Sequence, residues 1–355
     1  MPKESYNVIG VMSGTSLDGI DLAHIGFEIH DGNWAFTIRE SETIAYTAQW
    51  VKTLKNAVTF GDSELEKLNA DYTVLLGGII SGFISRHGIQ NLDAVCSHGH
   101  TILHQPQHGI TLQIGNLPQI ANIINQTVAC DFRVNDVALG GQGAPLVPIG
   151  DRILFPQYDY CLNLGGFSNI SFETAGLRLA FDISPVNTVL NFYANRLGHD
   201  FDDKGGISAS GKIDYELLHE LNAVGFYAKP YPKSLGFEFV RETIFPIIER
   251  FVISDADKLR TFTEHIAVQI ALALPRKSGK MLITGGGAYN EFLISRIQEH
   301  LPQTRIEIPQ AAILEFKEAL IFGLLGVLRI RNEVNVLASV TGARHDHSSG
   351  KIYTN

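Results

Sequence analysis

The same local pattern occurs twice in this chain, once in each half: an apolar strand, a glycine-containing turn and a second strand. The first copy is VMSGTSLDGID at residues 11–21, and the second is LNLGGFSNIS at residues 162–171. Each copy predicts two neighbouring strands joined by a tight turn. The chain has 355 residues, a length that exceeds one ordinary core and suits two domains. The repeated pattern and the length together predict a two-domain protein.

Other segments predict helices and further strands. Helices are expected at residues 64–87, 186–198 and 313–330, and strands at residues 92–99, 126–132 and 177–184. Residues 280–301 are expected to form a strand, a turn that contains three glycines, and an amphipathic helix. The glycine- and proline-rich segment VALGGQGAPLVP, residues 137–148, is predicted to cross between the domains. The longest apolar run, residues 319–328, is too short to span a bilayer and is expected to form a buried helix.

The overall charge restricts the partners that this chain can have. The formal net charge is −9, so nucleic acid and anionic membrane surfaces are repelled on average, and neither is expected as a partner. A phosphate ligand would need local amides, local cations or a metal ion. The cysteines Cys96, Cys130 and Cys161 form no CxxC pair, which fits a reducing cytosol. The first ten residues contain no apolar signal stretch, so a cytoplasmic location is expected.

Three glycine-rich turns are candidates for binding an anion. They are GTSLDGID at residues 14–21, NLGGFSN at residues 163–169 and TGGGAYN at residues 284–290. Glycine lets backbone amides approach a phosphate closely, and the third turn leads into a helix N-terminus. The first turn is not a P-loop, because Ile20 and Asp21 stand where Lys and Ser or Thr are required. The alternative for each turn is a plain connection without a ligand.

Two acidic residues are candidates for catalysis. Asp182 follows a buried strand in AFDISPVN, where catalytic carboxylates often project; the alternative is an acceptor in an Asx-turn. Glu318 lies in the apolar helix FKEALIFGLLG, where it either faces solvent or has a partner. The histidines in SHGHTILH, residues 97–104, lack a fourth metal ligand. They are predicted to be polar loop residues, and no metal site is assigned.

Several motifs occur together in one order along the chain. They are GVMSGTSLDGID, LQIGN at residues 112–116, DFRVNDVALGGQGAPLVP at residues 131–148, PKS-x-G at residues 232–236, GGG-x-x-N, EAL at residues 318–320 and VTGA at residues 340–343. This set resembles the anhydro-N-acetylmuramic acid kinases over residues 7–343. GTSLDG together with DFR and ALGGQGAPLVP is specific, whereas each shorter motif alone is weak.

The resemblance implies an α/β, two-domain, actin-like and ribonuclease-H-like ATPase fold with mixed sheets and an interdomain cleft. Residues 1–132 and about 318–355 would form the first domain, and about 133–317 the second. It also implies a homodimer, ATP with Mg²⁺ carried by the nucleotide, and a role in cell-wall sugar recycling. Water would open the anhydro bridge of 1,6-anhydro-N-acetylmuramic acid while the 6-oxygen takes the γ-phosphoryl group. The product would be N-acetylmuramic acid 6-phosphate.

The resemblance also assigns roles to residues at matching positions. Asp182 resembles the catalytic base that activates the water, and Glu318 resembles a second acid in the site. Sugar-side positions are Arg133, His98, Asn187 and Ser234. Nucleotide-side positions are Gly14, Thr15, Ser16, Leu17, Asp18, Gly19, Asp21, Gly165, Gly166, Gly285, Gly286, Gly287 and Asn290.

The chain departs from the family pattern at three places. DISPVN stands where the family has DTGPGN, so Ser184 and Val186 replace glycines, and their backbone is expected to avoid positive φ or accept strain. HGHT replaces HGQT, which puts His100 in place of a glutamine, and Cys130 replaces the glycine of GDFR. The alternatives are an actin-like ATPase that acts on another sugar and a non-catalytic ATP-binding relative. An NAD enzyme is disfavoured, since no GxGxxG follows the first strand.

Overall fold

The computed structural model describes residues 3–14 and 16–355 and divides the chain into two compact units. Unit 1 comprises Met1–Phe155 and Phe316–Asn355, and unit 2 comprises Pro156–Glu315. The first crossing thus comes after residue 155, later than the predicted boundary after residue 132. The reason is that the glycine-rich segment packs within unit 1, where the backbone N–H of Gln142 donates to the carbonyl of Thr341 at 2.8 Å. The C-terminal return to unit 1 lies close to its predicted place.

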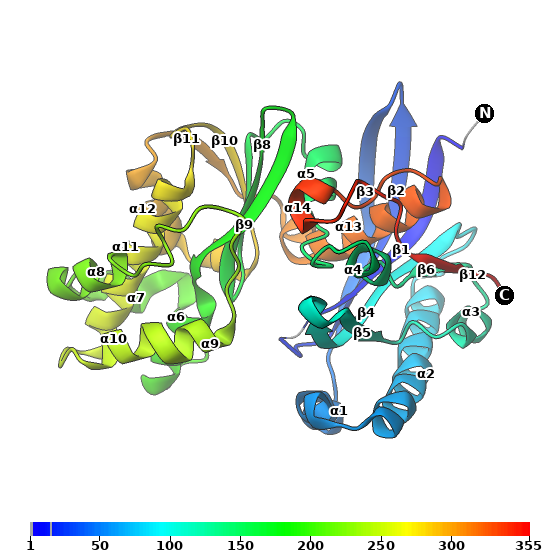
Figure 1. Ribbon diagram of the computed structural model, residues 1–355, viewed down its shortest axis with the longest axis horizontal. Helices are drawn as coiled ribbons and strands as arrows, with labels where there is room; N and C mark the ends of the chain where they lie inside the picture. The colour runs from blue at the N-terminus through cyan, green and yellow to red at the C-terminus, as the bar shows by residue number, and fades with distance from the viewer. Residues whose placement is uncertain (1–2, 15) are drawn as a thin grey trace. The chain divides into compact units, whose positions relative to one another are not determined.

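Unit 1 contains a mixed seven-stranded sheet in the order β12-β6-β4-β1-β2-β3, with β5 paired to β4 (Figure 1). Strand β2 pairs antiparallel with both β1 and β3, while β1 pairs with β4, and β4 with β6, in parallel. The elements are β1 Ser5–Ser13, β2 Ile20–His30, β3 Asn33–Ile44, α1 Ala48–Asn56, α2 Asp62–Arg86, β4 Ala94–Gln105, β5 Ile110–Ile114, α3 Gln119–Ile124, β6 Val128–Cys130, α4 Val134–Ala138, α5 Pro148–Leu154, α14 Ala338–Thr341 and β12 Lys351–Tyr353.

Both faces of the unit 1 sheet are covered. Alternate residues of the strands, such as Ile9 and Val11, belong to a core that includes one face of α2. On the opposite face, α13 (Ala311–Ile330) lies so close that a Cβ on Gly10 would collide with the carbonyl oxygen of Ala319. Gly326 of the same helix packs against Cys96 of β4 in the same way. These glycines let α13, which carries Glu318 one residue before Ala319, pack directly on the sheet.

Unit 2 contains a five-stranded sheet in the order β11-β10-β7-β8-β9. Its antiparallel strands β7, β8 and β9 are followed across the sheet by the parallel pairs β7–β10 and β10–β11. The elements are β7 Tyr160–Leu164, β8 Phe167–Thr174, β9 Leu177–Pro185, α6 Asn187–Arg196, α7 Gly206–Ser210, α8 Tyr215–Asn222, α9 Phe237–Phe239, α10 Phe245–Glu249, α11 Asp255–Ala273, β10 Ser278–Thr284, α12 Glu291–His300 and β11 Gln303–Glu307. Side chains of α6, α8, α11 and α12 join one face of the sheet in a single apolar core.

The two sheets therefore share one strand order. In unit 1 the antiparallel strands β3-β2-β1 are followed by the parallel strands β4 and β6, and in unit 2 the antiparallel strands β9-β8-β7 are followed by the parallel strands β10 and β11. This is the arrangement of the actin-like fold, so the predicted α/β, actin-like class with mixed sheets is confirmed. The repeated sequence pattern corresponds to β1–β2 in unit 1 and β7–β8 in unit 2. The predicted helices and strands are present, although β6 is limited to three residues. Gly198, with φ of 85°, follows the end of α6 in the left-handed conformation that glycine favours after a helix.

Helix α2 is also long and apolar enough to cross a membrane by length and composition alone. In the structure, 39% of its most apolar window is buried. Its buried side chains, among them Leu68, Tyr72 and Leu76, contribute to the unit 1 core. The predicted buried helix at residues 319–328 is confirmed, since it forms the C-terminal part of α13.

Candidate functional site

The first glycine turn connects β1 to β2 in unit 1. The backbone N–H of Leu17 donates to the carbonyl of Gly14 at 3.4 Å, and Leu17 adopts a positive φ of 64°. Gly19 is required by packing, because a Cβ there would lie 2.6 Å from the carbonyl oxygen of Ile44. Ser16 and Asp18 are exposed on the turn, whereas Thr15 lies outside the described residues. The turn thus presents polar groups to solvent, as a phosphate-binding segment requires.

Four polar side chains, three of them buried and Tyr46 half-buried, form a cluster directly before this turn. Ser13 Oγ lies 2.5 Å from the hydroxyl of Tyr46, 3.1 Å from that of Tyr72 and 2.9 Å from Nδ1 of His100. Burial lowers the pKa of His100 to about 4, so the ring is neutral near pH 7. The prediction of polar loop histidines is wrong here, since His98 and His100 lie buried within β4. Sequence reasoning missed Tyr46 and Tyr72, because nothing in their own segments marks them as partners of Ser13.

The other two glycine turns lie against each other in unit 2. A Cβ on Gly285 would lie 2.8 Å from the carbonyl oxygen of Leu164, and one on Gly287 would lie 2.7 Å from Leu164 Cβ. At the start of α6, the backbone N–H of Asn187 donates to the carbonyl of Gly165. The backbone N–H groups of Val186 and Thr188 donate to the carbonyl of Gly166. Asn290 caps α12 by accepting a hydrogen bond from the backbone N–H of Leu293 at 2.9 Å. The structure therefore brings together residues 165–166, 187 and 285–290 at the ends of β7 and β10.

Gly286 is the glycine of this group that the fold itself does not explain. Its φ is not positive, and a Cβ there would meet no atom closer than 3.7 Å, at Asn187 Nδ2. Gly285 and Gly287 are instead required by close contacts with Leu164. A glycine without a steric reason, at the end of a parallel strand, is typical of a backbone that a ligand approaches closely. Gly286 is therefore a candidate for close contact with an anionic ligand.

Arg133, His98 and the carbonyl of Gly143 form a hydrogen-bonded group in unit 1. Nε of Arg133 donates to Nε2 of His98 at 2.9 Å, and its Nη1 donates to the carbonyl of Gly143 at 2.8 Å. Nδ1 of His98 lies 2.9 Å from the carbonyl of Gly99, so Nδ1 carries the proton and Nε2 accepts. Burial, reinforced by the charge of Arg133, lowers the pKa of His98 well below its ordinary value. His98 is therefore a neutral residue that orients the guanidinium.

Glu318 lies near Arg133 and Asp21. Although part of its side chain is open to solvent, enclosure by the surrounding protein raises the pKa of the Glu318 carboxyl group. The guanidinium of Arg133 opposes this rise, while the carboxylate of Asp21 adds to it. Asp21 itself accepts a hydrogen bond from the hydroxyl of Thr43 at 2.6 Å. The structure thus brings the predicted acid Glu318 close to the predicted sugar-side arginine and to Asp21.

Asp136 holds the glycine-rich loop beside Arg133 in place. Its fully buried carboxylate accepts hydrogen bonds from the backbone N–H of Gly143 at 2.6 Å and from the hydroxyl of Thr341 at 2.7 Å. Gly141 has no room for a Cβ against the same carboxylate. Sequence reasoning did not single out Asp136. The only sequence signal for this contact was that the DFR and VTGA motifs occur in the same chain. Asp136 belongs to the segment that begins with DFR, and Thr341 belongs to VTGA.

Asp182 in β9 of unit 2 is held by the segment that follows Tyr231. Its backbone N–H donates to the carbonyl of Lys233 at 3.0 Å, and its Oδ2 accepts from the backbone N–H of Leu235 at 2.8 Å. Burial raises the pKa of the Asp182 carboxyl group to about 6, while the hydrogen bond from Leu235 acts in the opposite direction. Such a carboxylate is mostly ionised at pH 7 and basic enough to accept a proton.

Two further predicted sugar-side residues lie in unit 2. Ser234 is exposed between Lys233 and Leu235, so it adjoins the backbone that grips Asp182. Asn187 lies with the glycine turns, where its Nδ2 donates to the carbonyl of Leu164 at 3.3 Å. At the DISPVN departure, Ser184 and Val186 both avoid positive φ. The two serine hydroxyls Ser184 Oγ and Ser168 Oγ lie 3.0 Å apart, which gives Ser184 a partner on the neighbouring strand.

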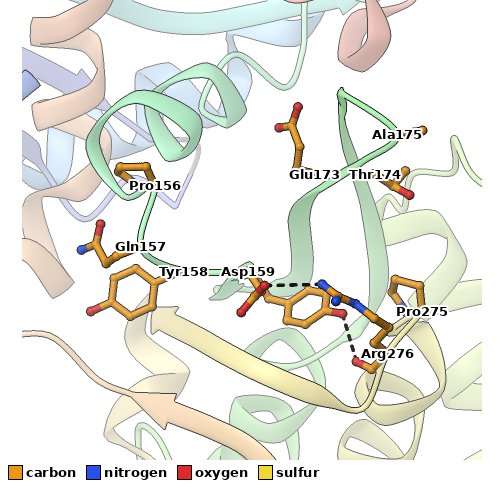
Figure 2. Close-up of a pocket in the computed structure, with 10 residues that line it drawn as sticks. Pro156, Gln157, Tyr158, Asp159, Glu173, Thr174, Ala175, Pro275 and Arg276 are labelled. Atoms are coloured by element: carbon orange, nitrogen blue, oxygen red, sulfur yellow. Dashed lines mark hydrogen bonds and ion pairs between the residues drawn. The ribbon is translucent and has the colours of Figure 1, made fainter. Parts of the chain in front are cut away.

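A cavity of about 520 Å³ opens elsewhere in unit 2 and contains none of the predicted site residues. Figure 2 shows that it is lined by residues around Tyr158 and Arg276. An ion pair of 3.4 Å joins Asp159 to Arg276, and the Tyr160 hydroxyl donates to the Arg276 carbonyl at 2.9 Å. Within residues 3–14 and 16–355, no group of three His, Cys, Asp or Glu side chains is arranged to hold a metal ion.

The chain is similar over nearly its whole length to one family of kinases. The family model described as anhydro-N-acetylmuramic acid kinase matches residues 6–355. The anhydro-N-acetylmuramic acid kinase of Xylella fastidiosa (strain Temecula1) is 35% identical over 377 residues, covering 99% of this chain and 97% of that protein. The protein of the same name from Variovorax paradoxus (strain S110) is 34% identical, with 97% and 98% covered. Among solved structures, component A of (R)-2-hydroxyglutaryl-CoA dehydratase from Acidaminococcus fermentans has 13% identity and a TM-score of 0.46, over 90% of this chain and 97% of that chain.

Proposed function

The chain belongs to the anhydro-N-acetylmuramic acid kinase family, and we propose that it converts 1,6-anhydro-N-acetylmuramic acid, ATP and water into N-acetylmuramic acid 6-phosphate and ADP. The observation that carries the proposal is the geometry of Asp182, a carboxylate held at Oδ2 by Leu235 and raised in pKa to about 6. A base of this strength suits proton removal from water near neutral pH.

The proposed reaction balances as one coupled displacement. The water oxygen bonds to the anomeric carbon, and the bond between that carbon and the bridging 6-oxygen breaks. The 6-oxygen takes the γ-phosphoryl group, and the proton of the water passes to Asp182. Attack by water at an acetal carbon requires a carboxylate on one face of the sugar, and one carboxylate can start both bond changes because the leaving oxygen is also the phosphoryl acceptor.

The other residues hold the reactants. Arg133, oriented by His98, donates to the sugar, and Glu318 lies near it as a second acid. The amides of the turns at residues 14–19, 165–166 and 285–287 receive the phosphates, as glycine-lined backbone does for anions. ATP supplies the phosphoryl group, and Mg²⁺ bound to it offsets negative charge. We further propose that the protein works in the cytoplasm, as a homodimer, in the recycling of cell-wall sugar.

Mass analysis of the product tests this function. The protein is incubated with anhydro-N-acetylmuramic acid and ATP in water enriched in heavy oxygen. The proposal predicts ATP-dependent formation of a monophosphorylated muramic acid that carries one heavy oxygen at the anomeric hydroxyl. Product without the label would contradict water attack at the anomeric carbon. ATP consumption only with other sugars, or nucleotide binding without any turnover, would contradict the assigned substrate or the enzymatic role.

A further inference from the structure

The side chain of Lys233 is anchored in the body of unit 2 without an acidic partner among the described residues. Its Nζ donates to the carbonyl oxygens of Tyr227 at 3.0 Å and Phe226 at 3.4 Å. The ammonium group also lies 4.9 Å from the ring centroid of Phe226 and 5.9 Å from that of Phe181. These contacts fix the position of Lys233 by carbonyl dipoles and aromatic faces.

The backbone around the same lysine determines the surroundings of Asp182. The carbonyl of Lys233 accepts the Asp182 N–H at 3.0 Å, and two residues later the Leu235 N–H donates to Oδ2 of the carboxylate at 2.8 Å. At the other end of this segment, the Tyr231 ring stacks on Phe181, with centroids 5.3 Å apart and planes 9° apart. Residues 231–235 therefore form a strap that holds Asp182, and Lys233 is its side-chain anchor.

We propose that Lys233 is a positioning residue for the general base: it holds the strap so that Leu235 binds Oδ2 of Asp182 and leaves the other carboxylate oxygen to the reacting water. The inference rests on the proposed function, because it assigns Lys233 to the reaction in which Asp182 is the base. Lys233 itself contacts no reacting atom in this account.

The physical consequence is a change in the acidity of Asp182. The Leu235 N–H stabilises the ionised carboxylate and opposes the effect of burial. A loosened strap weakens this hydrogen bond, so the pKa of Asp182 rises and a larger fraction of the base is protonated near pH 6. The carboxylate also loses its fixed orientation, which lowers kcat even where it is ionised.

The surroundings of Lys233 allow it to be replaced without collapse of the core. A cavity of about 220 Å³ adjoins the lysine and is lined by Ile183, Asn222, Tyr227 and Gln269, among others. This side of Lys233 is not closely packed, so a substitution there should leave the core intact. Lys233→Met keeps an apolar stem and removes the ammonium group. Lys233→Arg is the matched control, since it keeps a cation and donors that can reach the same carbonyls.

The first measurement is the pH dependence of kcat/KM for the sugar, from pH 5 to 9, in the wild type and both variants. We expect the acidic limb of Lys233→Met to move up by roughly half a pH unit or more, and kcat to fall about tenfold. Lys233→Arg should stay within about threefold of the wild type, and binding of a non-hydrolysable ATP analogue should be unchanged. A Lys233→Met enzyme with the wild-type pH profile and kcat would overturn the proposal.

A second measurement does not depend on turnover. The pKa of Asp182 is read from the carboxyl ¹³C shifts of protein labelled at aspartate, with Asp182→Asn used to assign the signal. The proposal predicts a higher Asp182 pKa in Lys233→Met than in the wild type, and an unchanged value in Lys233→Arg. Equal values in all three proteins would overturn it. If the wild type fails to turn over the sugar while the titration shifts as expected, the proposed function is wrong but the action of Lys233 on Asp182 is upheld.

Discussion

The hydroxyl of Thr341 donates a 2.7 Å hydrogen bond to Asp136, which joins two residues 205 positions apart. The same carboxylate binds the backbone N–H of Gly143, whose carbonyl accepts from Arg133. Thr341 thus acts on the predicted sugar-side arginine through two intermediate groups. A residue near the end of the chain contributes in this way to the orientation of the DFR motif.

Replacement of Thr341 by valine tests this connection. Valine keeps the shape but removes the donor, which leaves a buried carboxylate oxygen less well satisfied. We expect thermal or urea denaturation to show a loss of about 1–3 kcal/mol in the free energy of unfolding, and we expect a higher KM for the sugar. Thr341→Ser, which retains the hydroxyl, is the control. Equal stability and equal KM in the valine and serine variants would refute the connection.

Replacement of Arg133 by lysine tests its role toward the sugar. Arg133 uses two different nitrogens to bind His98 and Gly143, and a single ammonium group cannot reproduce this fork. Steady-state kinetics should show kcat/KM for the sugar reduced by about tenfold or more, which corresponds to roughly 1.4 kcal/mol. The dissociation constant for an ATP analogue should stay near the wild-type value. An unchanged sugar kcat/KM would remove Arg133 from the site.

Two alanine substitutions in the third glycine turn separate ligand binding from packing. In Gly286→Ala the added Cβ meets no protein atom within 3.7 Å, so the melting temperature should be unchanged while calorimetry shows ATP affinity reduced about tenfold. In Gly287→Ala the Cβ would lie 2.7 Å from Leu164 Cβ, so the protein itself should be destabilised by about 1–3 kcal/mol. Unchanged ATP affinity in Gly286→Ala would mean that the turn is only a connection.

The raised pKa of Asp182 also makes a prediction about stability. Burial raises it from 3.8 to about 6, so the folded state holds this proton more tightly than the unfolded state between these pH values. The Asp182 contribution to the free energy of unfolding is therefore fully present below about pH 4 and is lost as pH rises through about 6. Asp182→Asn should equal the wild type near pH 4 and exceed it by roughly 1–2 kcal/mol at pH 7.5. Denaturant unfolding at both pH values checks this; a variant less stable than the wild type at pH 7.5 would contradict it.

Periodic and local patterns predicted much of the fold. The spacing of Leu65, Leu68 and Tyr72 indicated α2, and the apolar strands on either side of GTSLDG indicated the β1–β2 pair. The boundary between the two units could not be predicted from the sequence, because the glycine-rich loop at residues 137–148 has the composition of a linker. It belongs to unit 1 only through tertiary contacts such as Gln142 with Thr341.

The candidate site was predicted unevenly for the same reason. Asp182 and Glu318 stood out as acids beside apolar segments, and motifs pointed to Arg133. The burial of His100 could not be predicted from its own segment, because its partners Ser13, Tyr46 and Tyr72 come from separate elements. Asp136 and Lys233 were missed likewise, since each acts through hydrogen bonds to residues far along the chain or to backbone groups.

The most direct test of the account is the turnover of Asp182→Asn with anhydro-N-acetylmuramic acid under saturating ATP. Asparagine keeps the size of the side chain and can still accept the hydrogen bond from Leu235, but it cannot take a proton from water at neutral pH. We expect a single-turnover rate at least ~10²-fold below the wild type, with binding of the sugar and of an ATP analogue retained. A variant that opens and phosphorylates the sugar at close to the wild-type rate would contradict the assignment of Asp182 as the base.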